Sequence, residues 1–310
     1  MLFTDSHTEG EPTRVLLSDA YRLRPLQELL REWSDANGAC VTPTALRALV
    51  ANPRAPDACV GALLCRPSSP DADFGVFFFN AQAALGMCGH GAIGVGKTID
   101  RFGGMLDGAV RIETRAGIVE VRREDNGAYS FENVPAFVVA SRVKIALDQT
   151  IVTGTVAYGG NEFFLVEESR PLRSIEAELA YTRSIRDALV QQAVRGHTGL
   201  IDHVALFVQP AREDAQERSF VLCPNDTYDR SPCGTGSSAR LAMLASEGRL
   251  REGAQHAIES AIGSRFIASF RGAAKGSIIA RISGRAWITA DGAMEEQRDP
   301  AQATGWSEST

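Results

Sequence analysis

The 310-residue sequence lacks any block of like charges and any long apolar run. Its 32 basic and 38 acidic side chains give a formal net charge of −6, so no basic surface for nucleic acid or for anionic membranes is expected. No apolar run approaches the roughly 18 residues of a membrane-spanning helix, and the polar N-terminal segment has no apolar signal core. We therefore expect a cytoplasmic protein that binds neither nucleic acid nor a membrane.

The six cysteines lack the spacing of a zinc knuckle, since none forms a Cys-x₂-Cys pair, and the five histidines do not cluster. No metal site is expected. Cys59, Cys65 and Cys223 lie in apolar, strand-like runs, where a cysteine is usually a small buried hydrophobic residue. Cys88 and Cys233 differ because glycine follows each of them directly and neither lies inside an apolar run.

Cys88 and Cys233 open the same short pattern, Cys-Gly-x-Gly followed by a run of small residues with helical character. The first copy reads Cys88-Gly89-His90-Gly91 and the second reads Cys233-Gly234-Thr235-Gly236. A thiol at the first turn of a helix lies beside unpaired N–H groups and the positive end of the helix dipole, which stabilise its thiolate. The next two N–H groups can bind a carboxylate. Two such motifs predict a site in which one thiol approaches the substrate from each side.

Each half of the sequence is mostly strand, with one helix that starts on the Cys-Gly-x-Gly pattern. The predicted helices cover residues 26–36, 89–102, 184–195 and 234–247. Because strands and helices do not alternate strictly, a parallel doubly wound sheet is not expected. The predicted fold class is α+β, with two similar domains, each a mostly antiparallel sheet wrapped around a central helix, and an active site in the cleft between them. The expected domains are residues 1–133 with 283–297 returning to them, residues 134–282, and a polar tail at 298–310.

Other functions that the glycine and cysteine motifs could indicate account for fewer of these residues. The segment from Gly89 to Gly94 matches the dinucleotide pattern G-x-G-x-x-G, but about eight residues separate it from the preceding strand and the second motif lacks the third glycine. Lys97 falls inside the predicted helix, so a phosphate-binding loop is not expected. A thiol hydrolase needs a histidine base with an orienting amide, and no local signature of that pair is present. A redox pair would not explain two anion-binding motifs, whereas proton transfer by two bases does.

Three segments resemble the proline racemase family. They are Asp5-Ser6-His7-Thr8-Glu9-Gly10-Glu11-Pro12-Thr13-Arg14, Leu85-Gly86-Met87-Cys88-Gly89-His90-Gly91 and Asp229-Arg230-Ser231-Pro232-Cys233-Gly234-Thr235-Gly236. The resemblance runs from about residue 3 to residue 289. It implies a fold like that of diaminopimelate epimerase and a racemase or epimerase reaction with no cofactor, neither pyridoxal phosphate nor metal.

The resemblance also implies a role for each matching residue. Cys88 and Cys233 are the two acid/base thiols, and the side chains of Asp229 and His90 face the ring nitrogen of the substrate. His203, which follows Asp202, lies near a substrate hydroxyl group. The N–H groups that hold the substrate carboxylate belong to Gly89, His90, Gly234 and Thr235.

The second cysteine favours epimerisation, because the dehydratases of the family usually lack it. Residues 220–224 and 228–232 are similar to 4-hydroxyproline epimerases, so the expected reaction interconverts trans-4-hydroxy-L-proline and cis-4-hydroxy-D-proline. A racemase or epimerase of another proline-like acid and a non-catalytic binding homologue are the alternatives. The sequence departs from the common family pattern at Glu9, at residues 80–84 and at Glu162. The expected partner is a small molecule, and a homodimer is left open.

Overall fold

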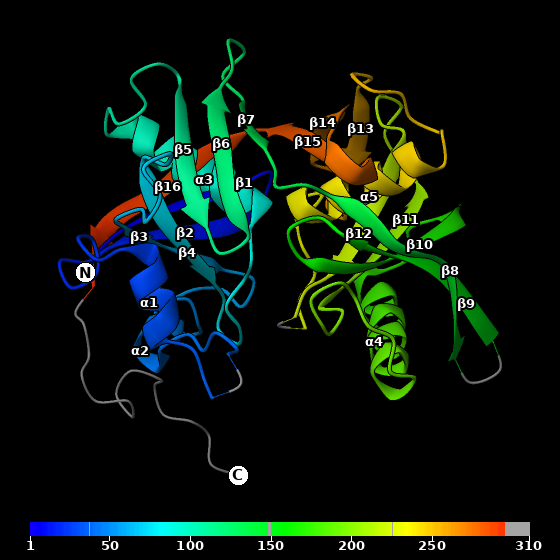
Figure 1. The fold of residues 1–310 in the computed structure, drawn as a ribbon. Coiled ribbons are helices and arrows are strands. Elements are labelled where there is room, and N and C mark those ends of the chain that lie inside the picture. The colour runs from blue at the N-terminus through cyan, green and yellow to red at the C-terminus, as the bar shows by residue number, and fades with distance from the viewer. Residues whose placement is uncertain (37, 148–149, 225, 295–310) are drawn as a thin grey trace. The chain divides into compact units, whose positions relative to one another are not determined.

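The computed structural model describes residues 1–294 except 37, 148–149 and 225. The chain divides into two compact units, one formed by Met1–Tyr129 with the segment that returns from Arg285, the other by Ser130–Gly284. The sequence-based boundaries lay at 133/134 and 282/283, and the tail predicted at 298–310 lies outside the described residues. Figure 1 shows the elements of each unit.

The first unit is a mixed sheet in the order β16-β1-β2-β3-β4-β5-β6. Its strands are β1 (Leu2–Thr8), β2 (Glu11–Leu17), β3 (Val60–Cys65), β4 (Phe74–Phe79), β5 (Ala109–Thr114), β6 (Gly117–Arg123) and β16 (Ala286–Ala293). Its helices are α1 (Leu26–Glu32), α2 (Thr44–Arg47) and α3 (Gly89–Arg101). The β2/β3 and β4/β5 pairs are parallel and the other described pairs of this unit are antiparallel. The strand β7 (Tyr129–Glu132) spans the boundary between the units.

The second unit has the order β15-β14-β13-β12-β11-β10-β9-β8. Its strands are β8 (Phe137–Leu147), β9 (Thr150–Tyr158), β10 (Glu162–Pro171), β11 (His203–Gln209), β12 (Glu217–Leu222), β13 (His256–Glu259), β14 (Arg265–Gly272) and β15 (Ile278–Gly284). Its helices are α4 (Ile175–Gln191), α5 (Gly234–Ser246) and a short 3₁₀ turn at Ala274–Gly276. The β10/β11 and β12/β13 pairs are parallel and the other described pairs are antiparallel.

The two units repeat one topology. In each, an antiparallel hairpin (β1/β2 or β9/β10) is followed by a parallel strand, an antiparallel strand, a central helix, a second parallel strand and an antiparallel strand. The register repeats as well, because Glu113 of β5 and Glu259 of β13 occupy equivalent positions in their parallel pairs. One carboxylate oxygen of each glutamate accepts hydrogen bonds from two consecutive loop N–H groups, those of Ser68 and Ser69 or of Ala211 and Arg212. The α+β class with two similar, mostly antiparallel units is confirmed.

The central helices α3 and α5 lie where the sequence predicts them, each enclosed by the strands of its own unit (Figure 1). Small residues make this close packing feasible. A Cβ atom on Gly96 of α3 would lie 2.4 Å from Cγ1 of Val121 on β6, and one on Gly94 would lie 2.9 Å from Oγ of Ser6 on β1. A larger residue at either position would push the sheet away from the helix.

The outer helices cover the opposite face of each sheet. Leu29 of α1 packs in one buried cluster with Phe77 of β4, and Leu189 of α4 packs in another with Phe220 of β12. Burying a side chain of this size stabilises the fold by about 1.5–3 kcal/mol.

The helix predicted at 184–195 is wrong in its start, because α4 begins at Ile175. Oγ of Ser174 accepts a hydrogen bond from the Ala177 N–H at 3.2 Å and caps the helix, and Glu176 and Glu178 lie in its first turn. A capping serine followed by acidic residues is a start signal that the sequence carries.

A buried ion network joins α5 to the second sheet. The Arg240 guanidinium, in a side chain only 3% exposed, donates to Glu217 at 2.6–3.0 Å and to Glu167 at 2.6 Å, and it lies 4.6 Å from the centre of the Phe207 ring. Burial by itself raises the pKa of Glu217, but the hydrogen bond with His256 and the charge of Arg240 outweigh it, so this pKa lies below its usual value.

We expect Arg240→Met to lower the free energy of unfolding by about 3–5 kcal/mol, because it leaves Glu217 as a buried charge without its main partner. Urea unfolding at neutral pH measures this, and the loss should shrink at acid pH, where Glu217 becomes protonated. The matched control is Arg249→Met, since Arg249 also binds Glu167 but is 47% exposed, and it should change stability by less than about 1 kcal/mol. Equal losses in the two variants would contradict the network's importance.

Candidate active site

Cys88 is the N-cap residue of α3 and uses its sulfur as the cap. The residue is 5% exposed and has extended backbone angles (φ −136°, ψ 113°), and its Sγ accepts a hydrogen bond from the Gly91 N–H at 3.3 Å. A Cβ atom on Gly91 would lie 2.9 Å from that sulfur and 2.9 Å from the Phe78 ring. The second glycine of the motif is therefore required for the sulfur to reach the helix.

Cys233 caps α5 in the same way, with Sγ 3.4 Å from the Gly236 nitrogen. Its backbone, however, has φ 64° and ψ 106°, a left-handed conformation that is unfavourable for a non-glycine residue. The flanking peptide is held in place, because the Pro232 carbonyl accepts hydrogen bonds from Ser219 and Ser237 and the Cys233 N–H donates to Oγ of Ser231 at 3.2 Å. Such locally stored strain is common at functional sites.

The first turns of α3 and α5 carry the N–H groups that the sequence assigns to carboxylate binding. Within the part of the chain that the structure describes, the N–H groups of Gly89, Gly234 and Thr235 donate to no other group. The start of each helix thus combines a sulfur, the positive end of the dipole and at least one open donor within one turn.

His90 lies beside the sulfur of Cys88 in the first turn of α3. It is buried, and its ring nitrogens are 3.5 and 3.6 Å from Sγ, so the ring lies against the thiol. The His90 carbonyl accepts a hydrogen bond from Oγ1 of Thr8 at 2.9 Å, which joins the end of β1 to this turn. The first unit therefore brings Cys88, Gly89 and His90 together.

Asp229 is buried close to Cys233 and is oriented by Ser231. Its Oδ1 accepts from the Ser231 N–H at 2.9 Å and from the Ser231 hydroxyl at 2.8 Å, and that hydroxyl in turn accepts from the Cys233 N–H. The second unit therefore brings Asp229, Cys233, Gly234 and Thr235 together. Ser231 was not among the predicted site residues, although it stands inside the motif that resembles the family.

Burial raises the pKa of the Cys233 thiol well above its usual value, and the negative charge of Asp229 raises it further. Hydrogen bonds from the Gly236 N–H and the Thr235 hydroxyl act in the opposite direction but are outweighed. The raised pKa favours the protonated thiol at Cys233 over the thiolate that a helix N-terminus by itself would stabilise.

His203 begins β11 and is 6% exposed. Its ring stacks on Phe163 with the centroids 4.7 Å apart, and Phe163 lies against Gly236 in the first turn of α5. Nδ1 of His203 is 2.7 Å from Oδ1 of Asp202, which also accepts the Glu162 N–H at 3.0 Å. These contacts fix the ring of His203 on the same side of β10 as α5.

The tip of the β9/β10 hairpin contacts the start of α5, and the sequence did not lead us to expect this contact. Asn161 donates to Oγ1 of Thr235 at 3.2 Å, and Asn133 donates to the Gly159 carbonyl at 2.7 Å and to Oγ of Ser238 at 2.8 Å. A Cβ atom on Gly159 would lie 2.2 Å from the Thr235 carbonyl oxygen. The Gly-Gly-Asn turn was the available signal, since glycine is needed where two backbones approach closely.

Two of the departures from the family pattern, Glu9 and Glu162, have structural roles here. The Glu9 N–H donates to the Arg285 carbonyl, and a carboxylate oxygen of Glu9 accepts from the Arg285 N–H. Glu162 is 2% exposed, and its Oε1 accepts from the N–H and the hydroxyl of Thr198 at 2.6 and 2.9 Å. It therefore anchors the loop that leads to Asp202.

Within the described ranges, no three or more His, Cys, Asp or Glu residues are grouped so that they could hold a metal ion. A search of the same ranges finds no helix with the length and hydrophobicity of a membrane span.

The comparisons with known proteins agree with one another. The model of the proline racemase family matches residues 3–306. The 4-hydroxyproline 2-epimerase of Chromohalobacter salexigens is 41% identical over 304 residues, covering 96% of this chain and 95% of that protein. The 4-hydroxyproline 2-epimerase of Ruegeria pomeroyi is 41% identical over 308 residues, covering 97% of each.

Solved structures share the fold. The probable proline racemase from Agrobacterium radiobacter K84, with bound carbonate, has a TM-score of 0.84 at 24% identity, covering 99% of this chain and 96% of its own. The hydroxyproline epimerase from Agrobacterium vitis, with bound trans-4-OH-L-proline, has a TM-score of 0.78 at 24% identity, covering 94% and 91%. At this identity the likeness shows the fold alone.

We expect Asp229→Asn to lower the pKa of Cys233, because it removes a negative charge while Oδ1 can still accept from Ser231. The rate of Cys233 alkylation by iodoacetamide, followed by peptide mass spectrometry across pH, should then rise at a lower pH than in the wild type. The control Asp214→Asn, an exposed carboxylate paired with Arg212, should leave the profile unchanged. An unchanged or upward-shifted profile in Asp229→Asn would contradict the electrostatic account.

Proposed function

Because the chain belongs to the proline racemase family, we propose that it is a cofactor-independent 4-hydroxyproline 2-epimerase that interconverts trans-4-hydroxy-L-proline and cis-4-hydroxy-D-proline. The observation that carries the proposal is the duplicated thiol cap, in which each unit supplies one buried cysteine with at least one open N–H group beside it. Relatives about 41% identical over nearly the full length and named for this activity support the substrate.

The proposed reaction inverts Cα by proton transfer at two thiols. One cysteine, as thiolate, removes the Cα proton, and the other, as thiol, delivers a proton to the opposite face. The raised pKa of Cys233 supports its role as the proton donor in the direction in which Cys88 removes the Cα proton. In the reverse direction the roles exchange, so no net proton is consumed.

The substrate carboxylate would bind at the helix N-termini, through the N–H groups of Gly89, His90, Gly234 and Thr235. The charge that develops as Cα loses its proton delocalises onto this carboxylate, so the same donors stabilise the transition state more than the ground state. Asp229, with the ring of His90, would face the cationic ring nitrogen. Neutralising Asp229 in this way would also lower the pKa of Cys233, which makes the thiol competent only when substrate is bound.

His203 is proposed to bind the ring hydroxyl of the substrate. Asp202 accepts from Nδ1, which leaves Nε2 as the atom that can reach a ligand, and stacking on Phe163 restricts the ring's orientation. The cytoplasmic location and homodimer formation considered from the sequence stay predictions.

We expect Cys88→Ser and Cys233→Ser each to reduce epimerisation at least about 100-fold, because a hydroxyl is too weak an acid to shuttle a proton near neutral pH. Polarimetry with trans-4-hydroxy-L-proline measures the rate. Serine is a good N-cap, so both variants should keep the fold. Cys40→Ser, at a half-buried cysteine that belongs to neither motif, should retain activity. Substantial turnover in either single variant would disprove the two-thiol scheme.

We expect His203→Phe to lower kcat/KM for trans-4-hydroxy-L-proline by about 10–100-fold while keeping the stack on Phe163. The readout that identifies hydroxyl recognition is the ratio of kcat/KM between trans-4-hydroxy-L-proline and L-proline. A purely structural histidine would lower both values alike and leave the ratio unchanged.

A racemase or epimerase of another proline-like acid is the second candidate, favoured by Glu162, which stands where the family commonly has an aromatic residue and which fixes the loop before Asp202. Polarimetry with a panel of proline derivatives separates the two. Faster turnover of a derivative without the 4-hydroxyl would favour this candidate, and binding without turnover of any derivative would favour a binding protein.

A further inference from the structure

The first unit contains a cavity of about 640 Å³ between the end of α1, helix α2 and the turn after β4. The residues that matter are Arg47 of α2, Arg115 from the β5–β6 turn, Thr42, Cys40 and Gln82. The volume is within the range of small-molecule sites and well above that of a single bound water.

The cavity is cationic. Its lining includes Arg47 and Arg115 but no aspartate or glutamate. Arg47 donates through Nη2 to Oγ1 of Thr44 at 3.3 Å, and Arg115 lies beside Cys40, where its charge lowers a thiol pKa that burial raises. Among the described residues neither guanidinium has a carboxylate partner, so two positive charges face the same space.

Two buried polar groups in the lining have no partner among the described residues. The Thr42 side chain belongs to a residue 3% exposed, and its Oγ1 makes no hydrogen bond. Nε of Arg47 is also buried without an acceptor. Unpaired buried polar groups are unfavourable in a fold and are rare, so an acceptor that reached Thr42 and Arg47 would be favourable here.

We propose that this cavity is a second ligand site, which binds a small organic anion carrying carboxylate or phosphate groups. Arg47 and Arg115 neutralise its charge, and a small side-chain shift on binding lets Nε of Arg47 and the hydroxyl of Thr42, which protein atoms cover in this structure, donate to its oxygen atoms. The site is distinct from the first turn of α3 but connected to it, because the Ala116 N–H next to Arg115 donates to the carbonyl of Gly86, two residues before Cys88.

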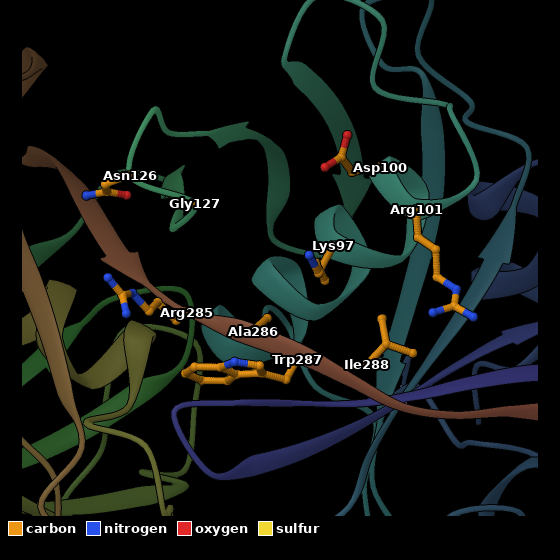
Figure 2. A pocket seen from close by; sticks show the side chains of 9 residues that line it. All are labelled: Lys97, Asp100, Arg101, Asn126, Gly127, Arg285, Ala286, Trp287 and Ile288. Carbon is orange, nitrogen blue, oxygen red and sulfur yellow. The ribbon is translucent and has the colours of Figure 1, made fainter.

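A second cavity of the same unit, of about 580 Å³, lacks the unpartnered buried groups of the first (Figure 2). Lys97 lines it, but so does Asp100, which binds Arg123 and Tyr129, while Arg101 pairs with Asp291. Residues 91–98 match the letters of a phosphate-binding loop, yet they lie inside α3, where backbone N–H groups form helical bonds. The lining is also cationic on balance, since it includes Lys97, Arg101 and Arg285 with one aspartate, but it contains no buried donor without a partner.

The test is isothermal titration calorimetry of the full-length protein with citrate and with inorganic phosphate, at constant ionic strength. We expect saturable binding of at least one anion to one site. Arg115→Gln and Thr42→Val should each weaken it, the arginine variant by about tenfold or more. Arg122→Gln, an exposed arginine paired with Glu120, is the matched control and should bind like the wild type. Tighter citrate binding indicates a carboxylate ligand, and tighter phosphate binding a phosphate ester.

A local readout makes the assignment specific. The bound anion should slow the alkylation of Cys40, measured by peptide mass spectrometry. Saturating pyrrole-2-carboxylate, a planar mimic of deprotonated proline that would occupy the proposed epimerase site, should not displace the bound anion. No saturable binding, equal affinity in Arg115→Gln, or displacement by pyrrole-2-carboxylate would overturn the proposal. Because the readout is binding and not turnover, it does not depend on the proposed epimerase activity.

Discussion

The structure depends on one repeated interaction, a cysteine sulfur that accepts the N–H of the third residue after it and so caps a central helix. This hydrogen bond fixes Sγ of Cys88 and of Cys233 at the start of a helix. It also favours glycine at positions 91 and 236, since a Cβ atom there would lie 2.9 or 3.2 Å from the sulfur. The open N–H groups of the same helical turns, those of Gly89, Gly234 and Thr235, can bind an anion beside the sulfurs.

The same arrangement of strands and hairpin surrounds the capped helix in each of the two units. Each unit wraps the same order of strands around its central helix, and each hairpin tip touches the first helical turn, through Thr8 in the first unit and Asn161 in the second. The charged and polar neighbours of the two sulfurs differ. Asp229 lies beside Cys233 and raises the pKa of its thiol, whereas His90 lies beside Cys88. An imino acid substrate carries both a carboxylate for the open N–H groups and a cationic nitrogen for Asp229.

Local signals in the sequence predicted the two cysteine motifs, the starts of α3 and α5 and the α+β class, because capping and glycine requirements act over a few residues. The start of α4 at Ile175 was missed although Ser174 and the acidic residues after it are local signals. What the sequence could not supply depends on contacts between distant segments. The buried partners of Arg240, the anchoring of Thr198 by Glu162 and the net pKa of Cys233 follow from tertiary burial, which no spacing rule encodes.

The central claim is that two different thiols handle the departing and the arriving proton. The direct measurement is deuterium incorporation at low conversion, with trans-4-hydroxy-L-proline incubated in D₂O and both epimers examined by mass spectrometry. The account predicts that newly formed cis-4-hydroxy-D-proline carries one deuterium at Cα, while unconverted substrate keeps its protium. Product that retains the substrate's own proton would contradict it, because a single base would then have returned the proton that it removed.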